Sequence, residues 1–189
     1  FGIQPTYPAT DYGYIESEVE MNDETNFSNI KRFIEKPNKK LAEKFINEKK
    51  FTWNSGIFLF KASTILREIN KFEPEIIKIC KKSLTKNLLD LNFRRIDREL
   101  FKLCPNKSID IAVMEKTYIG TVVKLDAGWD DLGSWQSIWN NSKKDHNQNI
   151  LKGKTYIKDV KNSYLRSEDK LLVGLGLENI FVIQTDSTV

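Results

Sequence analysis

The chain has 189 residues, 40% of them hydrophobic and 30% charged, and its 30 Lys and Arg against 26 Asp and Glu leave a formal net charge of +4. This composition suits a soluble globular chain of one domain with the start of a second, and basic residues scattered among acidic ones do not favour nucleic acid as a partner. Two cysteines without CxxC spacing and a single histidine argue against a zinc site or a Cys-His or Ser-His catalytic pair, and the absence of a signal sequence and of an apolar run of roughly 20 residues predicts a cytoplasmic protein.

The first third of the chain alternates strand and helix patterns. Apolar and polar residues alternate over residues 12–20 and 30–35, which predicts two strands. Apolar residues then recur at helical spacing over residues 41–46, directly after Pro37-Asn38, a typical helix start. Residues 51–60 follow as a long apolar strand that is broken by Asn54-Ser55-Gly56.

The middle of the chain carries three further helix patterns and another strand. Apolar residues at helical spacing predict helices over residues 65–72, 76–80 and 93–103. Residues 121–125 form a strand pattern that leads into the segment 128–139, whose second half is predicted as a helix with two tryptophans. Strands that feed loops and then helices are typical of an α/β fold.

After His146 the pattern changes to short strands without helices. The strand candidates are separated by turns rich in Lys, Asn, Asp, Ser and Gly, and they cover residues 156–157, 164–165, 171–173 and 181–183. We therefore predict a boundary near Asn147, with an α/β part over residues 1–146 and the start of an all-β module over residues 147–189. Strand-like runs reach both ends of the chain, so we expect an internal fragment of a longer protein.

Glu35 and Lys36 stand at the end of a predicted strand, where Pro37 forces the chain to turn. The turn would hold both side chains at the edge of the sheet. A carboxylate beside an ammonium can bind a sugar hydroxyl and a phosphate together. The alternative is a solvated Glu-Lys pair in front of a helix, which is common on protein surfaces.

Asn54 and Gly13 each allow two interpretations. Asn54 interrupts an apolar stretch between Trp53 and Gly56, so its amide either bonds the neighbouring backbone at a bulge or points at a ligand. Gly13 lies between two tyrosines, where the missing side chain either lets the backbone N–H approach a ligand or marks an ordinary strand glycine. The local pattern leaves both interpretations open.

Asp130 and Asp131 precede the predicted helix that begins near Ser134. One of them is expected to cap the first N–H groups of that helix, and the other is a candidate ligand for a divalent cation. A lone carboxylate is a poor Mg²⁺ site unless phosphate oxygens and a second acidic residue complete the shell, so Asp131 would need a partner. The nearby tryptophans are expected to pack in the core: Trp129, Trp135 and Trp139.

Five sequence motifs follow one another along the chain. They lie at residues 8–10 with 12–15, 32–37, 53–58, 108–117 and 127–135. In this order they resemble the sugar-phosphate nucleotidyltransferase family, and within it the bacterial mannose-1-phosphate guanylyltransferases. The resemblance implies the C-terminal part of a Rossmann-like, glycosyltransferase-A-like catalytic domain. Residues 166–169 and the strands after them resemble the β-helical linker that follows this domain in the family.

The resemblance implies transfer of GMP from GTP to mannose 1-phosphate, which gives GDP-mannose and diphosphate with Mg²⁺ as cofactor. Gly13, Glu35 and Asn54 would bind mannose hydroxyls. Lys36 would contact the sugar phosphate. Asp131 would be one of the carboxylates that hold Mg²⁺ between the nucleotide phosphates and the attacking group. Lys36 and Asp131 are thus the candidate catalytic residues.

The sequence departs from the family pattern in two places. Asp11 stands where the family usually has Gly after Thr10, so either the loop next to the expected mannose site bends differently or sugar binding is weaker. The family's Gly-rich loop, which binds the triphosphate, and the partner aspartate for magnesium belong to an N-terminal half that this sequence does not contain. We therefore expect the isolated chain to be inactive.

Two alternatives to the guanylyltransferase stay open. One is a nucleotidyltransferase for another sugar 1-phosphate, such as glucose 1-phosphate with UTP. The other is a non-catalytic subunit that binds a sugar phosphate for regulation, which Asp11 alone favours. The expected partners are the small-molecule substrates, with no nucleic acid and no membrane, and a homo-oligomer is compatible with the sequence.

Overall fold

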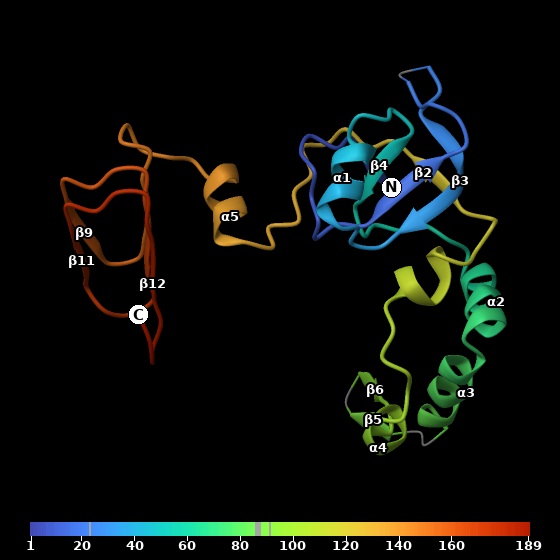
Figure 1. The fold of residues 1–189 in the computed structure, drawn as a ribbon. Coiled ribbons are helices and arrows are strands. Elements are labelled where there is room, and N and C mark those ends of the chain that lie inside the picture. The colour runs from blue at the N-terminus through green and yellow to red at the C-terminus, as the bar shows by residue number, and fades with distance from the viewer. Residues whose placement is uncertain (23, 86–87, 91) are drawn as a thin grey trace. The chain divides into compact units, whose positions relative to one another are not determined.

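The computed structural model describes residues 1–22, 24–85, 88–90 and 92–189, and the chain divides into two compact units, Phe1–Trp129 and Asp130–Val189. The first unit is built on a five-stranded sheet whose strands pair antiparallel (Figure 1). Their order in the sheet is β1 (Gly2–Ile3), β4 (Phe51–Asn54), β2 (Tyr14–Ser17), β3 (Phe27–Ile34) and β7 (Thr121–Val123).

Both faces of strand β2 are buried, which places it at the centre of the unit. Successive side chains of a strand point to opposite faces, so Tyr14 and Ile15 enter two different hydrophobic clusters. Tyr14 packs with Phe45 and Phe51 on one face, where the two phenylalanine rings stack with centroids 4.1 Å apart. Because β2 is packed on both faces, the core also holds Gly13, which directly precedes the first residue of this strand.

Helix α1 (Lys39–Phe45) lies against the sheet (Figure 1). It begins where the sequence predicts, because the side chain of Asn38 accepts a hydrogen bond of 3.0 Å from the backbone N–H of Leu41. Ala42 and Phe45 form its buried face. The short connection between β3 and α1 therefore has both of its ends held by packed elements.

The remaining helices of the first unit extend away from the sheet (Figure 1). They are α2 (Ala62–Phe72), α3 (Pro74–Ser83), α4 (Arg98–Phe101) and the π-helix η1 (Asp110–Met114). Pro74 starts α3, as its missing N–H allows at a first helical position. A hydrogen bond of 2.8 Å from the hydroxyl of Thr117 to Glu68 ties the segment after η1 to α2.

Two predicted elements of this unit are wrong in their extent. The helix expected over residues 93–103 is instead a hairpin of β5 (Leu88–Asp90) and β6 (Phe93–Arg95), followed by the single turn of α4. Asp97 explains the late start, because its carboxylate caps α4 through the N–H groups of Glu99 and Leu100. The strand expected over residues 51–60 ends at its predicted break at Asn54, and residues 57–60 beyond the break form no strand.

The second unit consists of one helix and two small parallel sheets. Its elements are α5 (Trp135–Asn141), β8 (Ile150–Lys152), β9 (Thr155–Lys158), β10 (Tyr164–Ser167), β11 (Leu172–Leu175) and β12 (Phe181–Gln184). Strands β8, β10 and β12 form one sheet, and β9 and β11 form the other. The side chain of buried Asn149 donates to the carbonyl of Val160 and accepts from the N–H of Ser163, so it joins successive turns of the backbone.

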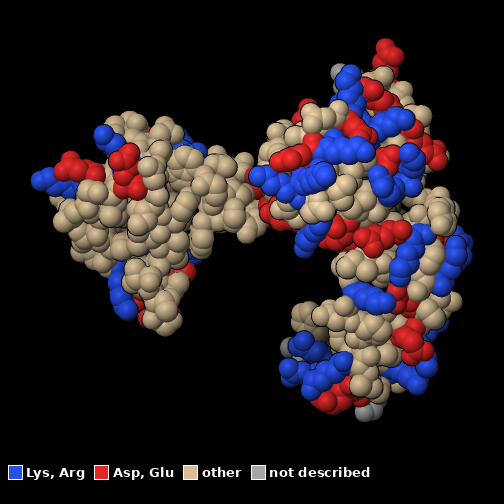
Figure 2. All heavy atoms as spheres, viewed as in Figure 1, with Lys and Arg blue, Asp and Glu red and all other residues tan. Residues whose placement is uncertain are grey.

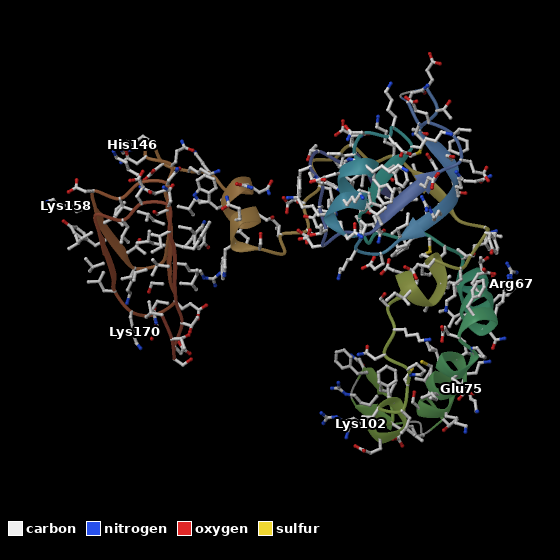
Figure 3. All side chains as sticks on the ribbon, viewed as in Figure 1. Arg67, Glu75, Lys102, His146, Lys158 and Lys170 are labelled. Carbon is white, nitrogen blue, oxygen red and sulfur yellow. The ribbon has the colours of Figure 1, made fainter. Side chains whose placement is uncertain are left out.

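Both signs of charge occur on the surface of the protein. Figure 2 shows Lys and Arg interspersed with Asp and Glu on the visible face. The only histidine, His146, is exposed in the turn before β8 (Figure 3). Within the described ranges, no helix combines the length and the apolar character that crossing a membrane requires.

Candidate active site

The connection from β3 to α1 holds Glu35 and Lys36 at the edge of the sheet. Lys36 adopts a left-handed backbone conformation with φ of 47°, which is uncommon for a residue other than glycine and costs about 1 kcal/mol or more. The two side chains form an ion pair of 3.7 Å, in which Glu35 is 21% exposed and Lys36 61% exposed. The carboxylate is therefore largely sheltered, whereas the ammonium reaches into solvent.

Gly13 precedes β2 and lies directly beside the Glu35 carboxylate. A Cβ atom on residue 13 would lie 2.7 Å from Oε2 of Glu35 and 3.4 Å from Cβ of Asn54. The carbonyl of Gly13 also accepts a 2.7 Å hydrogen bond from the backbone N–H of Asn54. Because residue 13 has no side chain, there is room for the Glu35 carboxylate. Neither sequence interpretation of Gly13 included this reason.

Asn54 ends strand β4 and uses both ends of its amide. Its Oδ1 accepts a 3.1 Å hydrogen bond from the N–H of Gly56, which has a left-handed φ of 70°. Its Nδ2 donates a 3.0 Å hydrogen bond to Oδ1 of Asp110. The hydrogen bond from Gly56 is the contact with neighbouring backbone that one of the two sequence interpretations predicted. The second hydrogen of Nδ2 can still donate to a ligand.

Asp110 and Glu115 are the residues of this cluster that sequence reasoning missed. They bracket the π-helix η1, in which the N–H of Glu115 donates to the carbonyl of Asp110 at 2.9 Å. Residues five apart share a face only when the backbone makes such i to i+5 bonds, so an α-helical period does not bring these two acids together. Glu115 also accepts a 3.4 Å hydrogen bond from the backbone N–H of Glu35.

The surroundings of Glu35 favour its protonated form. Burial raises the pKa of the Glu35 carboxyl above its ordinary value, and the negative charge of Asp110 adds to this effect. Lys36 opposes the rise in pKa, and Glu115 reinforces it. The cluster is thus rich in hydrogen-bond acceptors and carries one exposed cation, an arrangement that suits hydroxyl donors beside an anion.

Asp11, next to the expected mannose site, is exposed. The atoms nearest to a Cβ on residue 13 come from Glu35, Phe33 and Asn54. Tyr12 turns instead into the core, where its ring contacts Trp53 with centroids 5.1 Å apart.

Asp130 and Asp131 belong to the second unit. Asp130 accepts hydrogen bonds from the hydroxyl of Ser137, from the N–H of Leu132 at 2.8 Å and from the amide of Asn141 at 2.9 Å. The bond from Ser137 lowers the pKa of Asp130 below its ordinary value. Asp131 accepts a 3.1 Å hydrogen bond from the N–H of Gly133.

The expectation that one of these aspartates caps α5 is wrong, because the cap is Ser134, whose hydroxyl accepts from the N–H of Ser137 at 3.1 Å. Asp130 instead connects the loop to the helix, because it accepts hydrogen bonds from the side chains of Ser137 and Asn141. Trp129 packs against the core of the first unit as expected, whereas Trp135 is 40% exposed.

The described residues contain no group of three or more His, Cys, Asp or Glu side chains that could hold a metal ion. Among the described residues, Asp131 therefore belongs to no such group, and a bound Mg²⁺ ion would need further ligands. Of the predicted site residues, the structure brings together Gly13, Glu35, Lys36 and Asn54 in the first unit. We call these four residues the cradle. Asp131 lies in the second unit.

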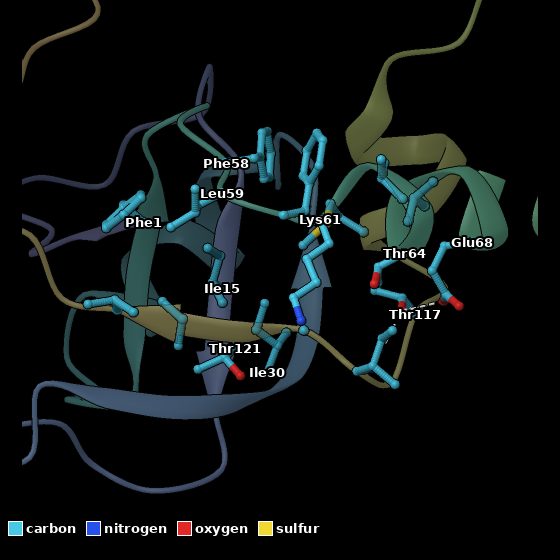
Figure 4. Close-up of a pocket in the computed structure, with 18 residues that line it drawn as sticks. Phe1, Ile15, Ile30, Phe58, Leu59, Lys61, Thr64, Glu68, Thr117 and Thr121 are labelled. Carbon is cyan, nitrogen blue, oxygen red and sulfur yellow. Dashed lines mark hydrogen bonds between the residues drawn. The ribbon is translucent and has the colours of Figure 1, made fainter.

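A separate cavity of about 350 Å³ lies between the sheet, α2 and the segment around η1 (Figure 4). Its lining is mainly apolar and includes Phe1, Ile15, Ile30, Phe58 and Leu59. None of the predicted site residues lines it. A wall of this composition does not suit a charged, hydroxyl-rich ligand.

Comparisons with known proteins add to this geometry. A sequence model of the family described as nucleotidyl transferase matches residues 1–148. Mannose-1-phosphate guanylyltransferase 2 of Escherichia coli O157:H7 is 42% identical over all of this chain and 40% of its own length. The mannose-1-phosphate guanylyltransferase RfbM of Salmonella typhimurium is 43% identical over 98% of this chain and 38% of its own length. The chain spans about two fifths of the length of these relatives.

A solved structure resembles the chain in three dimensions. The crystal structure described as mannose-1-phosphate geranyltransferase from Thermus thermophilus matches with a TM-score of 0.77 and 26% sequence identity. The match covers 98% of this chain and 52% of that one. The two chains share a mixed α/β fold.

Proposed function

Because the chain belongs to the nucleotidyl transferase family, we propose that the complete protein of which it forms part is a mannose-1-phosphate guanylyltransferase. The reaction transfers GMP from GTP to mannose 1-phosphate and releases diphosphate. The observation that carries the proposal is the cradle in which Glu35 and Asn54 meet over Gly13, with Lys36 exposed at its rim. The relatives that are named for this activity match the chain over nearly all of its length.

In this proposal the cradle binds the mannose ring. The Glu35 carboxylate accepts hydrogen bonds from sugar hydroxyls, and charge-assisted bonds of this kind are the stronger ones. The second hydrogen of Asn54 Nδ2 donates to a hydroxyl oxygen. Gly13 allows the close approach, because any side chain there would displace the Glu35 carboxylate.

Lys36 is proposed to contact the phosphate of the sugar. An oxygen of mannose 1-phosphate forms a bond to the α-phosphorus of GTP, while the bond from that phosphorus to the diphosphate oxygen breaks on the opposite side. Both reactants are anions. The exposed ammonium of Lys36, fixed by its ion pair with Glu35, would lower their repulsion and orient the attacking oxygen.

Asp131 is proposed as one ligand of a Mg²⁺ ion. Its carboxylate is a donor of the type that Mg²⁺ prefers, and Asp130 is engaged by Ser137 and Asn141. Mg²⁺ supplies charge neutralisation between the phosphates when it is bound. The remaining ligands would come from the substrates and from residues outside the described set.

The parallel strands of the second unit support a β-helical module as the finer description of residues 147–189. Successive strands of both small sheets pair in parallel with aligned registers, as coils of such a helix do. Residues 1–146 would then form the C-terminal part of a glycosyltransferase-A-like catalytic domain. The family match over residues 1–148 is compatible with this boundary.

Side-by-side assays of the full-length protein test the function. We expect diphosphate release with GTP and mannose 1-phosphate, and at least about a hundredfold lower kcat/KM with UTP and glucose 1-phosphate, because a site that hydrogen-bonds its substrate discriminates strongly. A preference for the second pair would assign another sugar to the site. Binding of mannose 1-phosphate without any turnover would favour the regulatory alternative.

A further inference from the structure

The side chain of Asn54 is fixed at both ends by partners that demand the same orientation. The N–H of Gly56 requires an acceptor and meets Oδ1 at 3.1 Å, while the carboxylate of Asp110 requires a donor and meets Nδ2 at 3.0 Å. A flipped amide would place its oxygen against a carboxylate and its NH₂ against an N–H. Both contacts would then be repulsive.

This double constraint determines what Asn54 offers to a ligand. One hydrogen of Nδ2 is used by Asp110, and the other stays available in a fixed direction. The backbone of Asn54 is bound to Gly13, so the amide and the Glu35 carboxylate are held by the same short stretch of sheet. A polyol that enters the cradle therefore meets one donor and one acceptor in a defined arrangement.

The position of Asp110 depends on the π-helix η1. Single turns of π-helix are rare and occur frequently at functional sites. This turn places Asp110 on Asn54 and Glu115 on the backbone N–H of Glu35. Two acids from one turn thus contact two different groups of the cradle.

We propose that Asp110 is a positioning residue of the sugar site, which orients the Asn54 amide so that its free N–H faces the substrate hydroxyls. The proposal rests on the proposed function for the identity of the substrate. Asp110 acts through Asn54. Glu99 provides a control, because it is an exposed acid of helix α4 that pairs with Lys102 and does not belong to this cluster.

The test compares Asp110→Ala, Asp110→Asn and the control Glu99→Gln in the full-length protein. We expect Asp110→Ala to raise the KM for mannose 1-phosphate about tenfold with less than a twofold change in the KM for GTP, the size expected when one hydrogen bond to a charged group is lost. Asp110→Asn should restore most of the loss, because its side-chain oxygen can still accept from Nδ2. Glu99→Gln should leave the sugar KM within about twofold of the original, because it removes only an exposed surface ion pair with Lys102.

Three results would overturn the proposal: an unchanged sugar KM in Asp110→Ala, an equal rise in both KM values, or no rescue by Asp110→Asn. A wild-type protein that does not use mannose 1-phosphate would instead end the proposed function. Asp110 is then judged from crystal structures of the wild type and Asp110→Ala. A rotated Asn54 amide in the variant supports the positioning role, and an amide that keeps its place refutes it.

Discussion

At the scale of single residues, the closeness of Gly13 to Glu35 makes a sharp prediction. Gly13→Ala places a methyl group 2.7 Å from Oε2 of Glu35 and 3.2 Å from Cζ of buried Phe33. The flexible carboxylate can move away at little cost, and the Phe33 ring needs to shift by only a few tenths of an ångström. We expect a rise of about tenfold or more in the KM for mannose 1-phosphate with a nearly unchanged unfolding midpoint. Steady-state kinetics and thermal unfolding of the full-length protein measure both.

Gly176→Ala is the matched control for this substitution. Gly176 has a φ of 61° and open space around its Cβ position, so alanine there costs about 1 kcal/mol of stability through backbone strain alone. The sugar KM should stay the same. If Gly13→Ala also left it unchanged, the carboxylate would not be part of the sugar site.

The raised pKa of Glu35 predicts an acid limb in the pH profile of sugar binding. In the proposed function the ionised carboxylate accepts hydrogen bonds from sugar hydroxyls, so kcat/KM for mannose 1-phosphate should fall as the pH falls through the raised pKa of Glu35. Replacing Glu115 by Gln removes one negative neighbour and should move this limb to lower pH. A limb that stays in place in Glu115→Gln would contradict the assignment.

The same shift has a defined sign for stability. The pKa of Glu35 is higher in the folded protein than in the unfolded chain, so the native state binds this proton more tightly. The contribution of Glu35 to stability is therefore fully present below the unfolded pKa and is lost as the pH rises through the folded pKa. Glu35→Gln should remove this dependence from the unfolding free energy, which denaturant titrations at several pH values measure.

Asp131 and Asp130 form a pair that separates metal binding from loop structure. Asp131→Ala in the full-length protein should lower Mg²⁺-dependent turnover at least about a thousandfold if the carboxylate holds the ion. Asp130→Asn should instead lower stability, because Asp130 is bound to Ser137 and Asn141. Mg²⁺ titrations of the rate distinguish the two, and a normal rate in Asp131→Ala would leave that residue as a loop partner of Gly133.

At the scale of elements, the capping of α1 connects the site to stability. Asn38 caps the helix, and Phe45 from its last turn stacks on Phe51 in the core. Asn38→Ala should cost about 1 kcal/mol of unfolding free energy, and Asn38→Gly only a few tenths of a kcal/mol. Denaturant unfolding measures both variants. Equal losses would show that the hydrogen bond to Leu41 is not the stabilising feature.

Elements with local signals were predictable from the sequence. The start of α1 after Pro37-Asn38 is confirmed, because capping chemistry is encoded in adjacent residues. The hairpin of β5 and β6 was missed, since apolar residues at helical spacing there gave the wrong period. The π-helix η1 was missed as well, because one extra residue in a turn leaves no periodic signal.

The cradle itself was predictable only in part. Glu35 and Lys36 follow β3 and Asn54 ends β4, and the sequence singled them out because strand ends concentrate polar groups at one edge of the sheet. The contact between Asn54 and Asp110 joins residues 56 positions apart and depends on the missed π-helix. Sequence reasoning therefore found the groups at the strand ends and missed the residue that orients one of them.

At the scale of the whole molecule, the chain carries the proposed sugar-binding residues, and the proposed phosphate transfer needs further groups. Its described residues contain no group of three metal-binding side chains, and it spans about two fifths of the length of its relatives. We therefore expect the isolated 189 residues to lack the activity of the complete protein.

The isolated chain should release no diphosphate from GTP and mannose 1-phosphate, while the complete protein does so under the same conditions. Alignment of the two anions and neutralisation of their charge both depend on groups beyond Lys36 and Asp131. If the cradle folds within the chain, calorimetry should still detect binding of mannose 1-phosphate, and Gly13→Ala should abolish that heat. Turnover by the isolated chain would mean that these residues complete the nucleotide and metal sites themselves, for example by assembling with further copies.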